Sequence, residues 1–296
     1  MALHNHSVKV SEKGMKVLRF PLTRLVIAAS ILFVGSALAA LIVEGFLMSF
    51  GKEGYDQIKP ILTPLFQIGF ALLGYWIFVS LFDGRSTTEL STGFFKQSGL
   101  GILLGFGFIS LVMGILALLG YYRIDGQNPD SAILQIFLMS LMAGIVEEIF
   151  MRGYFFRIVE EGLGTWWSVI FSALLFGFLH AWNPNASFIS SISIALTAGV
   201  VLALLYAITR NLWIVIGMHF AWNFTLGGIY GAPVSGSDAK GFFNGILEGP
   251  EWLTGGDFGP EASLITMVVF SLFGIYLIFK TIQVKQVKLP MWRKSK

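Results

Sequence analysis

Cysteine is absent from this 296-residue chain, and charged residues are scarce. The missing cysteine excludes disulfide bonds, thiolate metal sites and a cysteine nucleophile. Only 12% of the residues are charged and 55% are hydrophobic, whereas a soluble globular domain carries about 25% charged residues. A chain with so few charges cannot cover a surface that faces water, so lipid must surround much of it. The composition therefore predicts an integral membrane protein.

Eight apolar runs approach or exceed the length of about 20 helical residues that crosses a bilayer. They cover roughly residues 25–43, 61–82, 100–119, 132–156, 167–180, 188–208, 212–229 and 264–279, and the fifth is the shortest. We predict an all-α, polytopic membrane helix bundle of about eight transmembrane helices. It forms one domain over residues 25–280, with an N-terminal tail at 1–24 and a basic C-terminal tail at 281–296.

Lysine and arginine are distributed unevenly over the two sides that eight spans define. All but four of the 20 lie on the side of the termini, and the exceptions are Lys52, Lys59, Arg123 and Lys240. Cytoplasmic segments of membrane proteins carry such an excess, so both termini are expected in the cytoplasm. Topology thus explains the net charge of +3, and the expected partner is the lipid bilayer, not nucleic acid. The glycine-rich outer loop 231–260 is long, and its role is not predicted.

Few ionisable side chains lie inside the spans, where a charge costs about 2.5–3.5 kcal/mol on insertion scales. Together with one asparagine, they are Glu147, Glu148, Arg152, His180, His219 and Asn223. Glu148 and Arg152 are four residues apart and can pair, whereas Glu147 points about 100° away. A turn at residues 160–164 would place Glu147 and His180 at similar depth on an antiparallel hairpin. Helical distances from flanking arginines predict one polar cluster nearer the cytoplasmic face.

These residue types suit the hydrolysis of a peptide bond at the membrane. A carboxylate beside an imidazole can hold and deprotonate a water molecule. A second imidazole and an amide four residues later can stabilise the oxyanion of a tetrahedral intermediate. Two other classes stay open: a proton-coupled transporter, because Glu and His chains relay protons across membranes, and a non-catalytic membrane scaffold.

Three sequence strings carry a resemblance to a known family. They are EExxxR at residues 147–152, FxxxH at 176–180 and HxxxN at 219–223, on the fourth, fifth and seventh spans within a motif core of 132–229. In this order they resemble the CPBP family of intramembrane proteases, the CAAX-processing and bacteriocin-processing (Abi) family. The resemblance implies an eight-span helical bundle with a cavity open to the cytoplasm.

The resemblance also implies a role for each matching residue. Glu147 would be the general base and His180 would orient the water. His219 and Asn223 would lie at the oxyanion, with Glu148 and Arg152 as support. The substrate would be a membrane-associated peptide or protein, and the family includes enzymes that cleave prenylated CAAX tails. A compact chain without cysteine or targeting tails points to a prokaryotic plasma membrane.

Metal use is a separate question. Glu147 or Glu148, together with His180 and His219, could supply three zinc ligands. However, no HExxH pair lies on one helix, and asparagine is a poor zinc ligand. We therefore expect no cofactor, with one divalent metal, zinc, as the alternative.

Overall fold

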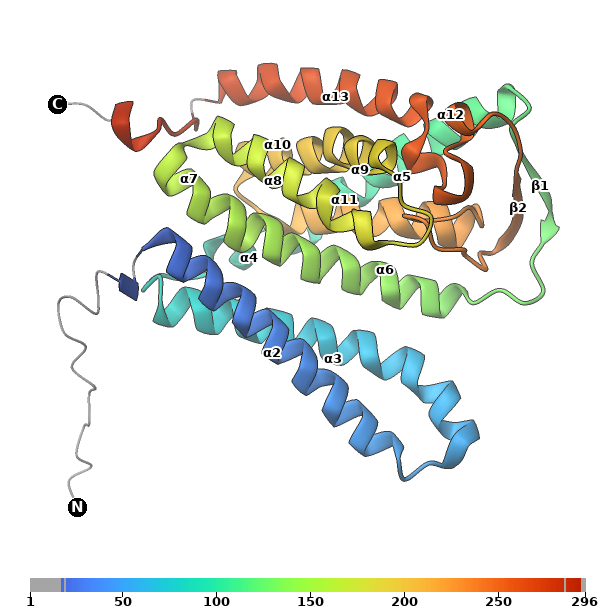
Figure 1. Cartoon of the computed structure of the whole chain (residues 1–296), viewed down its shortest axis with the longest axis horizontal. Coiled ribbons are helices and arrows are strands. Elements are labelled where there is room, and N and C mark those ends of the chain that lie inside the picture. The colour runs from blue at the N-terminus through green and yellow to red at the C-terminus, as the bar shows by residue number, and fades with distance from the viewer. Residues whose placement is uncertain (1–16, 19, 285, 294–296) are drawn as a thin grey trace.

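The computed structural model describes residues 17–18, 20–284 and 286–293, so most of the N-terminal tail and residues 285 and 294–296 lie outside the described residues. Eight helical spans, long and apolar enough to cross a membrane, confirm the predicted helix bundle (Figure 1). Four of the spans are single uninterrupted helices: α2 (Pro21–Leu47), α3 (Gly51–Leu81), α5 (Phe94–Leu118) and, after the outer loop, α13 (Leu264–Gln283).

The other four spans are composite, because π-helical or 3₁₀ turns interrupt or extend them. They are α6–η1–α7 (Ile133–Glu148, Ile149–Phe156, Arg157–Leu163), α8–η2 (Thr165–Leu179, His180–Trp182), α9–η3–α10 (Phe188–Ile194, Ala195–Gly199, Val200–Thr209) and α11–η4 (Leu212–Asn223, Phe224–Ile229). Two π-helical segments directly follow motif residues, since η1 begins after Glu148 and η4 after Asn223. Such segments are rare and often occur at functional sites.

Most spans extend beyond their apolar runs. The second span, α3, starts at Gly51 instead of residue 61 and includes two prolines, Pro60 and Pro64. The predicted turn at residues 160–164 is wrong, because α7 continues to Leu163 and Gly164 alone separates it from α8. Gly164 has a φ of +81°, which favours glycine. Hydropathy measures the lipid-facing length of a helix, so it misses polar turns that continue at either end.

Close packing of α5 against α11 places the seventh span in the centre of the bundle. A Cβ atom on Gly101 would lie 2.1 Å from the backbone oxygen of Ile214, and one on Gly105 would lie 2.4 Å from that of Met218. Small residues spaced four apart let two membrane helices approach in this way. The buried interior lies around α10 and α11, and α2 and α3 form a hairpin to one side (Figure 1).

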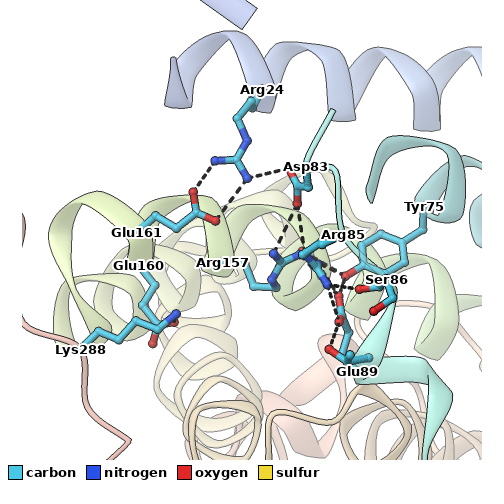
Figure 2. Close-up of polar contacts among 12 residues, drawn as sticks. Arg24, Tyr75, Asp83, Arg85, Ser86, Glu89, Arg157, Glu160, Glu161 and Lys288 are labelled. Carbon is cyan, nitrogen blue, oxygen red and sulfur yellow. Dashed lines mark hydrogen bonds and ion pairs between the residues drawn. The ribbon is translucent and has the colours of Figure 1, made fainter. Parts of the chain in front are cut away.

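Ion pairs join the helix ends near the two termini, a region called here the terminal end. Arg24 of α2 pairs with Asp83, at 2.7 Å, and with Glu161 of α7. Arg157 bridges the same Asp83, at 3.3 Å, and Glu89 of the short helix α4 (Thr88–Ser91), at 3.4 Å. Figure 2 shows this cluster, which holds the first two spans against the fourth.

A second group of ion pairs fixes the C-terminal segment to the same end. Glu160 accepts hydrogen bonds from Arg210 at 2.6 and 2.8 Å, and Lys288 lies 3.0 Å from the same carboxylate (Figure 2). These contacts confirm that an even number of spans returns the chain to its starting side. A short 3₁₀ turn, η7 (Met291–Arg293), follows.

The opposite end, called here the loop end, carries the extramembrane structure. Strands β1 (Tyr122–Gln127) and β2 (Phe243–Leu247) pair antiparallel, with Tyr122 opposite Leu247. Beside them the outer loop forms α12 (Glu251–Thr254) and two 3₁₀ turns, η5 (Gly256–Phe258) and η6 (Pro260–Ala262). The strand pair was not predicted, because its partners lie more than a hundred residues apart and neither is a long apolar run.

Candidate active site

All four residues predicted to be catalytic line one cavity of about 600 Å³. Glu147 comes from the last turn of α6, His180 from the end of α8, and His219 and Asn223 from α11. The Glu147 side chain is 39% exposed, so its carboxylate faces open space, while the side chain of His219 is only 8% exposed. The expected depth match of Glu147 and His180 therefore corresponds to a shared cavity.

His219 lies between the two adjacent glutamates. Its Nδ1 atom is 2.9 Å from Oε1 of Glu148, and its Nε2 atom is 3.9 Å from Oε2 of Glu147. An ionised carboxylate only accepts hydrogen bonds, so Nδ1 carries the proton that it donates to Glu148. This bond fixes the ring and directs Nε2 toward Glu147 and the cavity.

His180 is oriented by a backbone group in the same manner. Its Nδ1 atom is 2.8 Å from the carbonyl oxygen of Phe176, one turn earlier in α8. A carbonyl oxygen can only accept, so Nδ1 donates and Nε2 is the nitrogen left for the cavity. Both imidazoles thus keep Nε2 free, and both side chains line the cavity that Glu147 also lines.

The Phe176 ring lies among the polar residues of the site. Its centroid is 4.8 Å from that of His180 and 5.8 Å from that of His219, and the Arg152 guanidinium lies 5.0 Å from it. A guanidinium on an aromatic face is attracted by the ring quadrupole. Sequence analysis gave Phe176 only as a letter of the FxxxH string, yet its ring packs beside the arginine and both histidines.

Glu148 and Arg152 form the ion pair predicted from their spacing. Nη1 of Arg152 donates to Oε1 of Glu148 at 2.8 Å, and both side chains are fully buried. Nη2 donates to the carbonyl oxygen of Gly199 at 2.9 Å, in the π-helical segment η3 of the sixth span. Glu148 therefore contacts Arg152 and His219 with the same oxygen, which links the fourth, sixth and seventh spans.

Glu261 of η6 is a site residue that sequence analysis missed. It is 3% exposed, lines the cavity, and accepts hydrogen bonds from Nε1 of Trp222 at 2.8 Å and Oγ of Ser235 at 2.9 Å. It also accepts from the backbone nitrogen of Ser235. Burial raises the pKa of the Glu261 carboxyl above its ordinary value. The sequence shows it only as one of several acids in the outer loop, with no motif to distinguish it.

The cavity opens at the loop end of the bundle. Its exposed polar lining comes from Gln135 near the start of α6 and from Ser237, Asp238 and Lys240 of the outer loop. The resemblance implied an opening to the cytoplasm, and the charge distribution predicted cytoplasmic termini. These two expectations exclude each other, because the opening and the described terminal segments lie at opposite ends (Figure 1). Counting residues along the helices could not reveal this, since it does not show where the loops leave an opening.

A second cavity of about 490 Å³ adjoins the first between α2 and the fourth and fifth spans. Its wall on α2 consists of Ala29, Leu32 and Phe33, and its opposite wall is also mostly apolar. Four residues line both cavities: Glu147, Phe176, His180 and Asn183. The candidate catalytic groups can therefore be approached from the loop end and from the side of the bundle.

The predicted alternative of a metal site depends on which donors remain free. Glu148 is fully buried and lines neither cavity, so its role as a first metal ligand fits poorly. Glu147, His180 and His219 are the remaining candidate donors, and all three line the cavity. Within the described part of the chain, no three His, Asp or Glu side chains are close enough together to hold a metal ion. Metal dependence stays a prediction, with the metal-free form preferred.

Comparison with known proteins gives a family match for the central spans. Residues 129–225 match the family model described as Type II CAAX prenyl endopeptidase Rce1-like. Neither the curated proteins nor the solved structures include a significant match. The matched segment includes Glu147, His180, His219 and Asn223, and it confirms the resemblance to the CAAX-processing proteases that the three motifs indicated.

Proposed function

We propose that this multi-pass membrane protein is an intramembrane endopeptidase that hydrolyses a peptide bond with water activated by Glu147 and His180. The match to a prenyl endopeptidase family supports peptidase chemistry over a transporter or a scaffold. One observation carries the proposal: a partly exposed carboxylate lines one cavity together with two imidazoles whose Nδ1 atoms are each held by a hydrogen bond. That arrangement suits the activation of water beside a polarised carbonyl group.

In the first step, Glu147 accepts a proton from a water molecule that also donates to Nε2 of His180. The resulting hydroxide attacks the scissile carbonyl carbon, forming the tetrahedral intermediate. A positioned base of this kind contributes about 10²–10⁴-fold to a rate. The mainly apolar walls around Glu147 strengthen its electrostatic interaction with the reacting groups.

The oxyanion forms beside His219 and Asn223. A protonated Nε2 on His219 and the amide N–H of Asn223 would donate to it, and the Glu148 carboxylate on Nδ1 balances the positive charge of that ring. Removing one such donor typically costs about 10²–10³ in kcat. Glu147 then returns its proton to the leaving nitrogen, which releases the amine and a carboxylic acid.

The proposed substrates are not restricted to the prenylated proteins that the family description names. A membrane-associated peptide or protein would reach Glu147 through either cavity, and an apolar group, prenyl or otherwise, would suit the second one. We place the protein in a prokaryotic plasma membrane, as the sequence predicts. No nucleic-acid partner is invoked.

The test is cleavage of a peptide library by the purified protein in nanodiscs, with farnesylated and unmodified peptides and mass spectrometry of the products. Glu147→Gln keeps the side-chain shape but removes the base, so it should lose at least about 10²-fold in rate. Glu248→Gln is the matched control, because this glutamate is 68% exposed and pairs with Arg123 on the surface. Equal rates for the wild type and Glu147→Gln would refute Glu147 as the base.

A further inference from the structure

The opening of the active-site cavity lies at the loop end, where the outer loop adds to the walls that the spans form. Ser235, Asp238 and Lys240 come from that loop, and Glu261 anchors it through Trp222 in the seventh span. No residue of the described interhelical segments at the terminal end lines this cavity.

The terminal end is closed by contrast. Between Glu147 and that end, the fourth span places Arg152, Tyr154 and Phe156 in fully buried positions. Beyond them the ion pairs of Arg157 and Glu160 with neighbouring helix ends tie the fourth span to the rest of the bundle (Figure 2). Packed side chains and paired charges therefore leave the loop end as the aqueous approach.

Charge assigns each end to a side of the membrane. Among the described residues, the terminal end gathers arginines and lysines from five separate segments, and examples are Arg24, Arg85, Arg157, Arg210 and Lys288. The loop end carries the acids of the outer loop and has few basic residues. This excess places the terminal end in the cytoplasm, so the cavity opens on the opposite side.

We infer that the protease acts on polypeptide presented at the extracytoplasmic face, and that its substrate is the outer juxtamembrane segment of a membrane-anchored chain. This inference rests on the proposed function. The polar opening would take the extended segment outside the bilayer. The apolar second cavity, which α2 walls on one side and which shares Glu147 and His180 with the first, would take the adjoining membrane anchor.

The order of the two cavities suits a substrate that is anchored in the membrane, because a substrate chain leaving the bilayer meets the second cavity before the first. A segment leaving the bilayer beside Leu32 and Phe33 passes Glu147 and His180 before it reaches Asp238 and Lys240. The scissile bond therefore lies at the junction of the anchor and the outer segment. A chain ending on the cytoplasmic side meets the closed terminal end instead.

The natural absence of cysteine allows a topology test that does not depend on cleavage. Lys240→Cys places a thiol at the cavity opening, and Lys96→Cys places one on an exposed residue at the terminal end. With a membrane-impermeant maleimide on intact bacterial cells, Lys240→Cys should be labelled and Lys96→Cys only after permeabilisation. The reverse pattern overturns the inference, and the cysteine-free parent measures the background.

The anchor is tested in proteoliposomes whose orientation has been measured with the same label. A peptide with an apolar membrane segment before its polar part should be cleaved only by molecules whose loop end faces it. Its KM should be at least about tenfold lower than that of the polar part alone, a difference of roughly 1.4 kcal/mol in binding. Equal KM values overturn the anchor, and cleavage only by the opposite orientation overturns the side. If labelling is as expected but no peptide is cleaved in either orientation, the proposed function fails and not the topology.

Discussion

Replacing Arg152 with alanine should destabilise the protein far more than replacing Glu147 does. The guanidinium is fully buried and donates to Glu148 and to the backbone of Gly199. Removing one partner of a buried ion pair costs about 3–5 kcal/mol, because the other charge is left unpaired. His219 still donates to Glu148, so a loss near the lower limit, about 3 kcal/mol, is expected. Glu147→Ala removes a half-exposed group whose ion-pair contact is at 3.9 Å, and such a change costs about 0.5 kcal/mol or less.

The assay is unfolding by SDS in mixed micelles, followed through the fluorescence of the eight tryptophans. Combining Glu148→Gln with Arg152→Met removes both charges and should recover part of the stability lost in Arg152→Ala, since no buried charge is then unpaired. Catalysis should not recover in that double variant, because His219 loses its carboxylate partner. Equal stability losses in Arg152→Ala and Glu147→Ala would refute this division between support and catalysis.

Three further predictions follow from other contacts. Gly101→Leu should prevent stable folding, because even a Cβ atom there lies 2.1 Å from the Ile214 backbone oxygen; size-exclusion chromatography of the purified protein measures this. Burial raises the pKa of Glu261, so the folded state keeps that proton to higher pH than the unfolded chain, and stability should fall as pH rises above about 4.3, the usual value. Glu261→Gln should flatten this fall, and a pH series of SDS unfolding that shows identical slopes would contradict it. Chelation should leave wild-type cleavage intact, whereas a loss that added zinc restores would place Glu147 and His180 in a metal site.

The fold was predictable to the extent that it depends on apolar length. The eight spans follow from hydropathy. Polar helix ends were missed, as at Gly51 and at the continuation of α7 through Glu160. From the sequence, the Glu160 carboxylate would be expected to face solvent. It is buried because it pairs with Arg210, which lies far away in the sequence.

The candidate site was predictable where spacing along one helix decides which groups meet. The i to i+4 relation of Glu148 and Arg152 predicted their ion pair. Contacts between separate segments were not predictable, including the hydrogen bond from His219 to Glu148 and the insertion of Glu261 from the outer loop. The end of the bundle at which the cavity opens was likewise not predictable, because it depends on how the outer loop packs.

The most direct test of the central claim asks whether Glu147 and His180 act on one water molecule. Cleavage rates would be measured for Glu147→Ala, His180→Ala and the double variant in nanodiscs, with folding of each verified by circular dichroism. Residues that act as a unit are strongly non-additive, so the double variant should be no slower than the worse single variant. Losses that multiply in the double variant would show two independent contributions and contradict a shared water.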